Sequence, residues 1–166
     1  MEKENQTNPS FDHEAVYQIL NKIAIFGGFS DGQLQRVLRH LKKVVYGPDQ
    51  VIYRQGDKPS HIYIVLKGAV KIFVDQDHRH PLELKEFLVG DCFGETSVLG
   101  IQSHSVTAIA ERETELIVLE RQVLFHFYEK DKEFFSLFIL NIARETCRRL
   151  HQTDEMLLKY VLSDKQ

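Results

Sequence analysis

The sequence contains no tryptophan, only two cysteines and no long apolar run. Cys92 and Cys147 do not form a C-x-x-C pair, and they fit the reduced thiols of a cytosolic protein. No apolar run approaches the roughly 20 residues that a transmembrane helix needs. The first ten residues are polar, whereas a signal peptide would be apolar there. We therefore expect a cytoplasmic protein that does not act in or on a membrane.

The chain also lacks a strong charge of either sign. Its net charge is -3, from 21 Lys and Arg against 24 Asp and Glu, which gives no general attraction to nucleic acid or anionic lipid. With 166 residues, 43% hydrophobic and 27% charged, the sequence is typical of one soluble globular domain.

The first part of the chain predicts a tail and two helices. Residues 1–10 show no apolar periodicity, so we expect a disordered tail. Over residues 11–41 the apolar residues recur at spacings of three and four, which is typical of helices. Gly27 and Gly28 separate the two segments, and Ser30 followed by Gln33 is a capping-box signature for the second helix.

Residues 42–120 have the pattern of a β-roll. Turn signals separate short segments rich in β-branched and aromatic residues, and in one of them Leu82 and Leu84 alternate with charged side chains. With no helices between the strands, a sandwich or barrel is favoured over a parallel sheet. The predicted strands are residues 44–46, 51–54, 62–66, 69–74, 82–88, 105–110 and 115–119.

Residues 121–162 predict two further helices, a short one over 122–129 and a long one that Asp131 begins. In the long helix an apolar stripe recurs at spacings of three and four and is interrupted by Asp154. The stripe either packs on the protein's own barrel or forms a parallel two-chain seam in a homodimer. It consists of Leu140, Ala143, Cys147, Leu150, Leu157 and Val161.

Three arginines lie close together on the same long helix. Arg144, Arg148 and Arg149 precede Asp154 and Glu155, so local ion pairs are available to them. Such exposed pairs are worth a few tenths of a kcal/mol each. We interpret the cluster as a solvated face, with a partner-binding face as the alternative.

The chemically informative segment is residues 90–108, GDCFGETSVLGIQSHSVTA. A glycine-bearing loop that ends in a short helical turn leaves backbone N–H groups unpaired, and such a nest suits a phosphate. The carboxylate of Glu95 would be repelled by that phosphate and is better suited to accept hydrogen bonds from sugar hydroxyls. An anion-plus-ribose site is therefore a coherent interpretation.

The order of elements and three short sequence motifs resemble the cyclic-nucleotide-binding domain of the bacterial catabolite-activator and protein-kinase regulatory-subunit type. The motifs are VIYRQGD at residues 51–57, IYIVLKGAVKIF at 62–73 and GDCFGE at 90–95. The resemblance covers residues 25–160. It implies a double-stranded β-helix, or jelly roll, with N-terminal helices and a long C-terminal helix. Residues 11–162 would then form one such domain.

The resemblance also implies a ligand and the residues that hold it. The family's phosphate-binding cassette would begin before Gly94, which allows close backbone approach, and Glu95 would hold the ribose 2′-hydroxyl. Thr96 and Ser97 lie where the short helix offers its amides. The ligand implied is cyclic AMP or cyclic GMP, and no cofactor is required.

The sequence departs from the family pattern at the residue that pairs with the cyclic phosphate. The family has an arginine there, and this chain has His104, with Ser103 in place of the usual proline. An arginine fork makes a bidentate, permanently charged contact, whereas histidine offers one donor and is only partly charged near neutrality. The loss costs about 2–4 kcal/mol, or roughly 30- to 1000-fold in affinity. Either His104 takes over part of the arginine's contact with the cyclic phosphate, or the pocket is no longer used. The hydroxyl of the next residue, Ser105, is a feature that would favour guanine as the base.

The histidines also suggest a metal site. The β-roll resembles the cupin barrel, whose metal enzymes use a His-x-His pair, a glutamate and a later histidine. His78 and His80 supply the pair and Glu83 follows. The pair lies in a polar loop, however, and no second cupin motif with a histidine appears downstream. We interpret them as a solvated loop, and we expect neither a metal site nor a catalytic one.

These observations favour a regulatory sensor that binds a cyclic nucleotide and signals through its C-terminal helix. Only a few residues follow Tyr160, too few for the recognition helix of a DNA-binding domain, so we expect no DNA partner. The alternative is a degenerate domain that no longer binds nucleotide and acts as a protein-interaction or dimerisation module. Both interpretations require a protein partner, which the sequence does not identify, or a homodimer.

Overall fold

A computed structural model describes residues 13–74 and 82–163 of the chain. Its first elements are helix α1 (His13–Leu20), the short 3-10 helix η1 (Ala24–Phe26) and helix α2 (Asp31–Leu38). The predicted capping box is confirmed, because the backbone N–H of Gln33 donates to the Ser30 hydroxyl and the Gln33 side chain accepts from the Ser30 N–H. The predicted tail, residues 1–10, lies outside the described residues.

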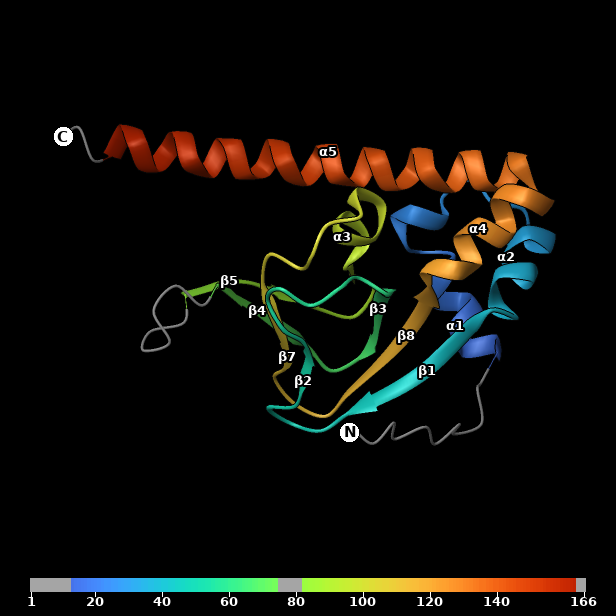
Figure 1. Ribbon diagram of the computed structural model, residues 1–166, viewed down its shortest axis with the longest axis horizontal. Coiled ribbons are helices and arrows are strands. Elements are labelled where there is room, and N and C mark those ends of the chain that lie inside the picture. The colour runs from blue at the N-terminus through green and yellow to red at the C-terminus, as the bar shows by residue number, and fades with distance from the viewer. Residues whose placement is uncertain (1–12, 75–81, 164–166) are drawn as a thin grey trace.

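The predicted jelly roll is confirmed. The described residues form two four-stranded antiparallel sheets, with orders β1-β8-β3-β6 and β2-β7-β4-β5, and helices flank them (Figure 1). The non-consecutive neighbours in each sheet are what a roll of crossed-over strands requires. The strands are β1 (Leu41–Tyr46), β2 (Val51–Tyr53), β3 (His61–Lys67), β4 (Val70–Val74), β5 (Leu82–Phe87), β6 (Cys92–Phe93), β7 (Thr107–Ala110) and β8 (Thr114–Glu120).

Strand β3 divides its side chains between two hydrophobic clusters. Successive side chains of a strand point to opposite faces. Ile62 and Ile64 therefore pack in the cluster that includes the helices, while Tyr63 and Val65 pack inside the roll. Because both faces are covered, the strand reads as a continuous apolar run instead of an alternating one.

Strand β5 does not bury the leucines of its alternating pattern. Leu82 is 57% exposed and Leu84 is 50% exposed. β5 lies at the edge of its sheet, where β4 is its only described neighbour, and Figure 1 shows it extending away from the roll. The alternation therefore predicted a strand correctly, but it did not mark a buried face.

Two helices follow the roll, α4 (Arg121–Lys130) and α5 (Lys132–Ser163). The predicted start of the long helix is confirmed within one residue, because a carboxylate oxygen of Asp131 accepts a hydrogen bond from the N–H of Phe134. Asn141 donates to the carbonyl oxygens of Ile25 and Gly27, which ties α5 to η1. The buried side chains of α5 are Phe134, Phe138, Asn141, Ile142 and Glu145.

The apolar stripe predicted on α5 does not pack on the roll. Its members lie on the outer side of the helix: Leu140 is 46% exposed, Leu150 is 60% exposed and Leu157 is 60% exposed. The interpretation that this stripe covers the protein's own barrel is therefore wrong. The helix packs instead through the neighbouring face that carries Phe134 and Phe138, because these residues fit the aromatic cluster beneath α5.

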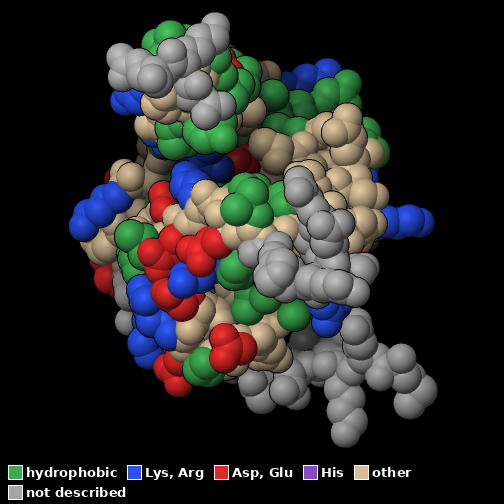
Figure 2. Space-filling model, turned by 90° about the vertical axis from the view of Figure 1, so that its left-hand side faces the viewer, with side chains coloured by type: hydrophobic (Ala, Val, Ile, Leu, Met, Phe, Trp, Pro, Cys, Tyr) green, Lys and Arg blue, Asp and Glu red, His purple; other side chains and the backbone are tan. Residues whose placement is uncertain are grey.

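The second half of α5 extends beyond the roll. Every side chain of residues 150–163 is exposed, and Figure 1 shows this part of the helix passing over β5. Figure 2 views the molecule from this end and shows hydrophobic side chains gathered around the helix at the top. No helix in the described part of the chain is long and apolar enough to cross a bilayer.

Candidate functional site

The backbone around Gly94 shapes the candidate site. Gly94 links β6 to helix α3 (Glu95–Gly100) and has a φ of 83°. A Cβ at this position would lie 2.9 Å from the carbonyl oxygen of His61 and 3.1 Å from Cδ2 of Tyr63. Only glycine combines this left-handed conformation with so close an approach to β3. The turn aims the first residue of α3, Glu95, into the molecule.

A cavity of about 160 Å³ opens beside this turn. All six residues that the sequence resemblance assigns to ligand binding lie around it, although they come from two segments of the chain. The structure thus brings Gly94, Glu95, Thr96 and Ser97 together with His104 and Ser105. The rest of the lining is Tyr53, Ile72, Phe87, Phe93, Val106 and Arg149.

Glu95 forms the charged side of the cavity. Its side chain is 1% exposed, and its Oε1 lies 2.7 Å from Nη1 of Arg149. Its Oε2 is buried and has no hydrogen-bond partner among the residues that the structure describes. Burial raises the pKa of Glu95, and the charge of Arg149 opposes that rise. A buried carboxylate oxygen without a donor costs free energy, so the site is incomplete without a hydroxyl or amide that supplies one.

Arg149 connects this side of the cavity to α5. Its Nη2 donates to the carbonyl oxygen of Cys92 at 2.7 Å, and its Nε donates to Oε1 of Glu145 at 2.8 Å. Arg148 forms two further hydrogen bonds with Glu145, at 2.9 and 2.6 Å. Oxygen acceptors on three elements, Glu95 in α3, Cys92 in β6 and Glu145 in α5, therefore hold one guanidinium, and two of these contacts are charge-assisted.

The interpretation of the arginine cluster as a solvated face is wrong for Arg149. Its side chain is only 19% exposed and is joined to a buried carboxylate 54 residues away. One signal in the sequence pointed to this position. Arg149 follows Glu145 by four residues, and Glu145 follows Asn141 by four, so all three continue the buried face of α5.

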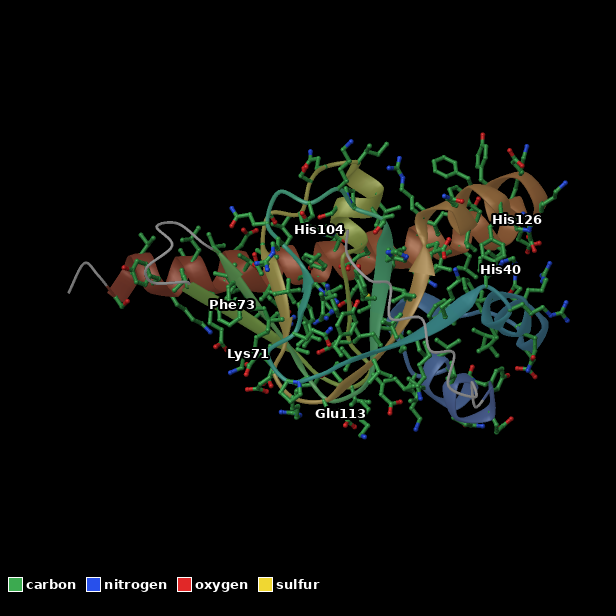
Figure 3. The ribbon with its side chains drawn as sticks, turned by 60° about the horizontal axis from the view of Figure 1, so that its bottom comes forward. His40, Lys71, Phe73, His104, Glu113 and His126 are labelled. Carbon is green, nitrogen blue, oxygen red and sulfur yellow. The ribbon has the colours of Figure 1, made fainter. Side chains whose placement is uncertain are left out.

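His104, which is labelled in Figure 3, forms an uncharged part of the cavity wall. The side chain is 4% exposed, and its ring stacks on Tyr53 with centroids 3.7 Å apart and planes at 11°. Its backbone is fixed as well, since His104 N–H donates to the Asp57 carbonyl and its own carbonyl accepts from the Gly56 N–H. Burial lowers the pKa of His104, with the charge of Asp57 acting weakly against the shift.

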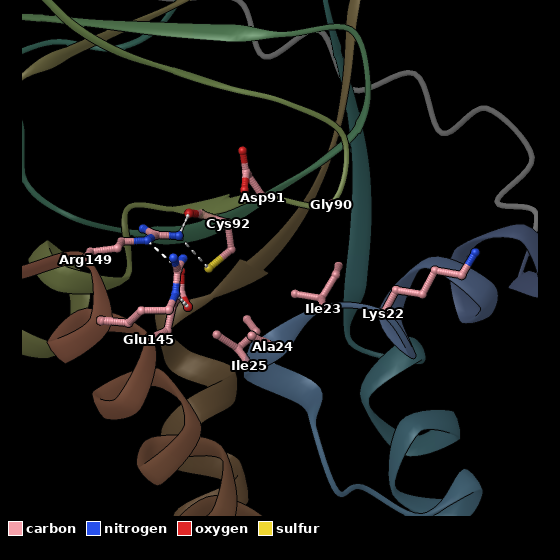
Figure 4. Close-up of a pocket in the computed structure, with 10 residues that line it drawn as sticks. Lys22, Ile23, Ala24, Ile25, Gly90, Asp91, Cys92, Glu145 and Arg149 are labelled. Carbon is pink, nitrogen blue, oxygen red and sulfur yellow. Dashed lines mark hydrogen bonds and ion pairs between the residues drawn. The ribbon is translucent and has the colours of Figure 1, made fainter. Parts of the chain in front are cut away.

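A second hollow, of about 280 Å³, lies on the other side of Arg149 (Figure 4). Arg148 and Arg149 are paired with Glu145 here, and Lys22 and Asp91 are the other charged residues of the lining. Burial raises the pKa of the Cys92 thiol, which lies here, to about 12. The lining is Lys22, Ile23, Ala24, Ile25, Gly90, Asp91, Cys92, Glu145, Arg148 and Arg149.

Among residues 13–74 and 82–163, no three His, Cys, Asp or Glu side chains are grouped as a metal ion would need. The His78 and His80 pair of the cupin alternative lies outside the described residues. Glu83, its third member, faces Lys71 at 3.5 Å. Elsewhere, His40 and His126 lie 5.2 Å apart between ring centroids, towards one end of the molecule and away from His104 (Figure 3).

Comparison with known families gives a match over residues 43–131 to the profile of the cyclic nucleotide-binding domain. The matched segment runs from β1 to the end of α4 and includes the whole cavity wall except for Arg149. It does not include α5. The residue that ties the helix to Glu95 is therefore outside the part that the family profile describes.

Curated relatives include ion channels and a cyclic AMP receptor protein. The potassium channel AKT6 of Arabidopsis thaliana is 25% identical over 157 residues, 95% of this chain and 17% of the channel. The cyclic AMP receptor protein of Thermus thermophilus is 27% identical over 130 residues, 78% of this chain and 58% of that protein. The chain thus spans less than two thirds of the length of these relatives.

Solved structures share the fold. A cyclic nucleotide-binding domain from Methylobacillus flagellatus has a TM-score of 0.78 at 20% identity and covers 88% of this chain and 82% of its own. The catabolite activator protein of Thermus thermophilus has a TM-score of 0.71 at 27% identity, over 81% of this chain and 61% of its own. A kinase regulatory subunit from Trypanosoma cruzi, bound to guanosine, has a TM-score of 0.64 at 21% identity. The match covers 75% of this chain and 43% of that subunit.

Proposed function

Because this chain belongs to the cyclic nucleotide-binding domain family, we propose that it is a regulatory ligand-binding module and not an enzyme. Its ligand carries a ribose and binds in the cavity between Glu95 and His104. Cyclic AMP and cyclic GMP are the ligands that family membership indicates, and no cofactor takes part. The bound state is communicated to a protein partner in the cytoplasm through α5.

The observation that carries this proposal is the unpaired Oε2 of Glu95. A carboxylate that is 1% exposed and lacks a donor on one oxygen is poised to accept a hydrogen bond from a ligand. Neighbouring ribose hydroxyls are donors of the right type, because the carboxylate would repel an anion. The Gly94 turn supports the same assignment, since it fixes Glu95 at the base of the cavity.

The ligands of structurally similar proteins support the ligand class. A Toxoplasma gondii kinase regulatory domain was solved with cAMP, at a TM-score of 0.68. A Trypanosoma brucei subunit described as cAMP-independent was solved with cAMP as the mutant E311A, T318R, V319A, at a TM-score of 0.70. Both share this fold at 20% and 21% identity, so they support a nucleoside-containing ligand without selecting one.

Arg149 provides a route from the ligand to α5. A ribose hydroxyl that donates to Oε2 of Glu95 shares one carboxylate with the guanidinium of Arg149, which binds Oε1. Sharing this negative charge between two donors weakens the contact of Arg149 without displacing it, and the helix shifts about the hinge at residues 129–131. A ligand moves such an equilibrium only by its difference in affinity for the two states, which the shared carboxylate supplies.

Isothermal titration calorimetry with cyclic AMP and cyclic GMP at pH 6 and pH 7.5 tests the ligand class. We expect binding, and we expect Glu95→Gln to weaken it by about 10- to 100-fold because a charged acceptor is lost. Glu113→Gln is the matched control, since Glu113 is 66% exposed in a distant turn. The absence of heat at millimolar ligand at both pH values, with adenosine and guanosine also inactive, would contradict the proposal.

A probe on α5 tests the signalling step. Cys147 is exposed, whereas Cys92 is buried with a raised pKa, so a maleimide label attaches selectively to α5. We expect the spectrum of the label to change on ligand addition in the wild type. In Arg149→Met, where the connection is already broken, ligand should change it little. An equal response in both proteins would contradict the role of Arg149.

A second candidate function, homodimerisation through α5, is favoured by the exposed stripe. Leu140, Ala143, Cys147, Leu150, Leu157 and Val161 follow alternating spacings of three and four, with Asp154 at the position between Leu150 and Leu157. That spacing is the heptad pattern of a parallel two-stranded coiled coil. A second copy of α5 presents the same stripe and is therefore the partner that we propose. This dimer is also the form in which the chain would act if it bound no nucleotide.

Sedimentation equilibrium tests the dimer. The wild type should sediment as a dimer at micromolar concentration, and Leu157→Lys should shift it to monomer, because a charge enters the seam. Met156→Lys is the control, since Met156 is 63% exposed but lies off the stripe. A monomeric wild type, or equal effects of both variants, would contradict the seam.

A further inference from the structure

Two parts of the cavity wall, which we call the Glu95 end and the His104 end, offer a ligand different chemistry. At the Glu95 end, the buried Oε2 has no hydrogen-bond donor among the described residues. At the other, His104 presents an imidazole that receives no hydrogen bond from the described residues and whose orientation is set by the Tyr53 stack at 3.7 Å. Its backbone is held on both sides by the loop that carries Gly56 and Asp57. The orientation of the ring is therefore already set before a ligand binds, and the ring does not rotate to contact it.

The cation of the cavity is not available to a ligand phosphate. Of the described residues that line it, Arg149 is the one with a positive charge, and its guanidinium is bound to Glu95, Cys92 and Glu145. Lys85 lies nearby over the ring of Phe87 at 4.9 Å, on the exposed strand β5, and does not line the cavity. A phosphate entering here would lose its hydration without gaining a counter-ion, which is costly.

A hydroxyl suits the His104 end better than a phosphate does. A neutral imidazole has one N–H donor and one nitrogen acceptor, and burial lowers the pKa of His104 toward this form. A hydroxyl can use either nitrogen, whereas phosphate oxygens can use only the donor and are repelled by the acceptor. Ser97 and Ser105 also line the cavity, and their hydroxyls pair with an uncharged group without a charge penalty.

We propose that at neutral pH this cavity binds an uncharged ribonucleoside more tightly than the corresponding cyclic nucleotide, and that His104 determines this preference. The proposal rests on the function proposed above, because it requires the ribose to lie on Glu95. The free hydroxyl of the nucleoside then occupies the His104 end, where the cyclic phosphate of a nucleotide would lie. Cyclic nucleotides remain weaker ligands of the same site.

Titration calorimetry at pH 7.5 with adenosine, guanosine, cyclic AMP and cyclic GMP tests the order of affinity. We expect each nucleoside to bind at least about tenfold more tightly than its cyclic nucleotide, since the difference is one uncompensated charged contact. Cyclic nucleotides that bind as tightly as the nucleosides, or more tightly, would overturn this inference and leave the proposed function standing. If none of the four binds at millimolar concentration, the proposed function itself fails.

Two substitutions assign the preference to His104. His104→Arg should reverse the order, because a permanent, forked cation favours the phosphate. His104→Gln should keep the wild-type order, because it remains uncharged, and it serves if the arginine variant does not fold. His126→Arg adds the same charge to an exposed residue on α4 and is the matched control. An unreversed order in a folded His104→Arg protein, or a reversed order in His104→Gln, would contradict the role of His104.

Discussion

The two sides of the cavity differ in how their charges are balanced. On the Glu95 side a carboxylate, a second carboxylate from α5 and two arginines form one connected network, with Arg149 at its centre. On the His104 side an uncharged ring lies flat on another ring, and backbone hydrogen bonds hold it. The first side depends on long-range charge pairs and the second on packing. In the function that we propose, the first side binds a hydroxyl, and the second side does not bind an anion.

The largest effect is expected from removing the cation of the Glu95 side. Arg149→Met keeps the apolar stem but leaves Glu95 buried without a counter-charge, which should cost about 3 kcal/mol of unfolding free energy. For a chain of this size the melting temperature should fall by roughly 6–12 °C. Arg148→Met is the control, because Arg148 is 54% exposed and Arg149 still pairs with Glu145. Equal melting temperatures for the two variants would show that the network does not depend on Arg149.

The turn that delivers Glu95 should be nearly as sensitive. Gly94→Ala forces a Cβ into the left-handed region and against the His61 carbonyl, and should cost about 2 kcal/mol in urea unfolding. Gly32→Ala is the matched control, since Gly32 lies in α2 with nothing within 4 Å of an added Cβ. That change should be neutral or stabilise by about 0.5 kcal/mol. A Gly94 variant as stable as the Gly32 variant would contradict the steric argument.

The His104 side should show its uncharged state in the pH dependence of stability. Burial is the largest cause of the lowered pKa values of His104, His61 and His40. Below about pH 6.5 the unfolded chain then binds more protons than the folded one, so stability falls as pH falls. Each histidine adds a slope of at most about 1.4 kcal/mol per pH unit. The raised pKa of Glu95 acts in the opposite sense, because its folded state binds more protons.

Urea unfolding between pH 5.5 and 7.5 measures this slope. His104→Gln removes the titrating ring and should reduce the slope without abolishing it, because His61 and His40 remain. A slope of the same size in the variant would show that the pKa of His104 does not differ between the folded and unfolded states. Burial would then not keep the ring uncharged, which would contradict the contrast with the Glu95 side.

The smallest effect is expected at the rim of the His104 side. Ser105 is exposed beside His104 and lines the cavity, where its hydroxyl can bind a guanine. Ser105→Ala should reduce the preference for guanosine over adenosine by about twofold, or about 0.5 kcal/mol, as measured by calorimetry. Ser103→Ala, an exposed serine outside the cavity lining, should leave the ratio unchanged. A ratio that does not respond to Ser105→Ala would remove Ser105 from base recognition.

Most of the fold was predictable because its signals are local. The capping box at Ser30, the glycine turns and the short β-branched runs each depend on a few neighbouring residues, and the structure contains the elements that they indicate. The prediction failed where burial decides the outcome. Leu82 and Leu84 have the pattern of a half-buried strand, yet an edge strand with one described neighbour leaves them exposed.

The α5 stripe shows the same limit. Apolar residues at spacings of three and four indicate that one face of a helix is apolar, but they do not indicate what covers that face. Leu150 and Leu157 were candidates for either the roll or a second chain, and the structure excludes the roll because the aromatic residues Phe134 and Phe138 fill that place.

The sequence by itself predicted a β-roll from short-range spacing, which the chain carries in any conformation. Its resemblance to the family implied the jelly roll, the cassette at Gly94 and the position of His104 where the family has an arginine. Only the tertiary structure decided that Arg149 reaches Glu95 across 54 residues and that His104 is buried against Tyr53. Ion pairing and pKa values depend on distances and burial in the folded structure. For residues so far apart in the chain, neither can be predicted from the order of residues in the sequence alone.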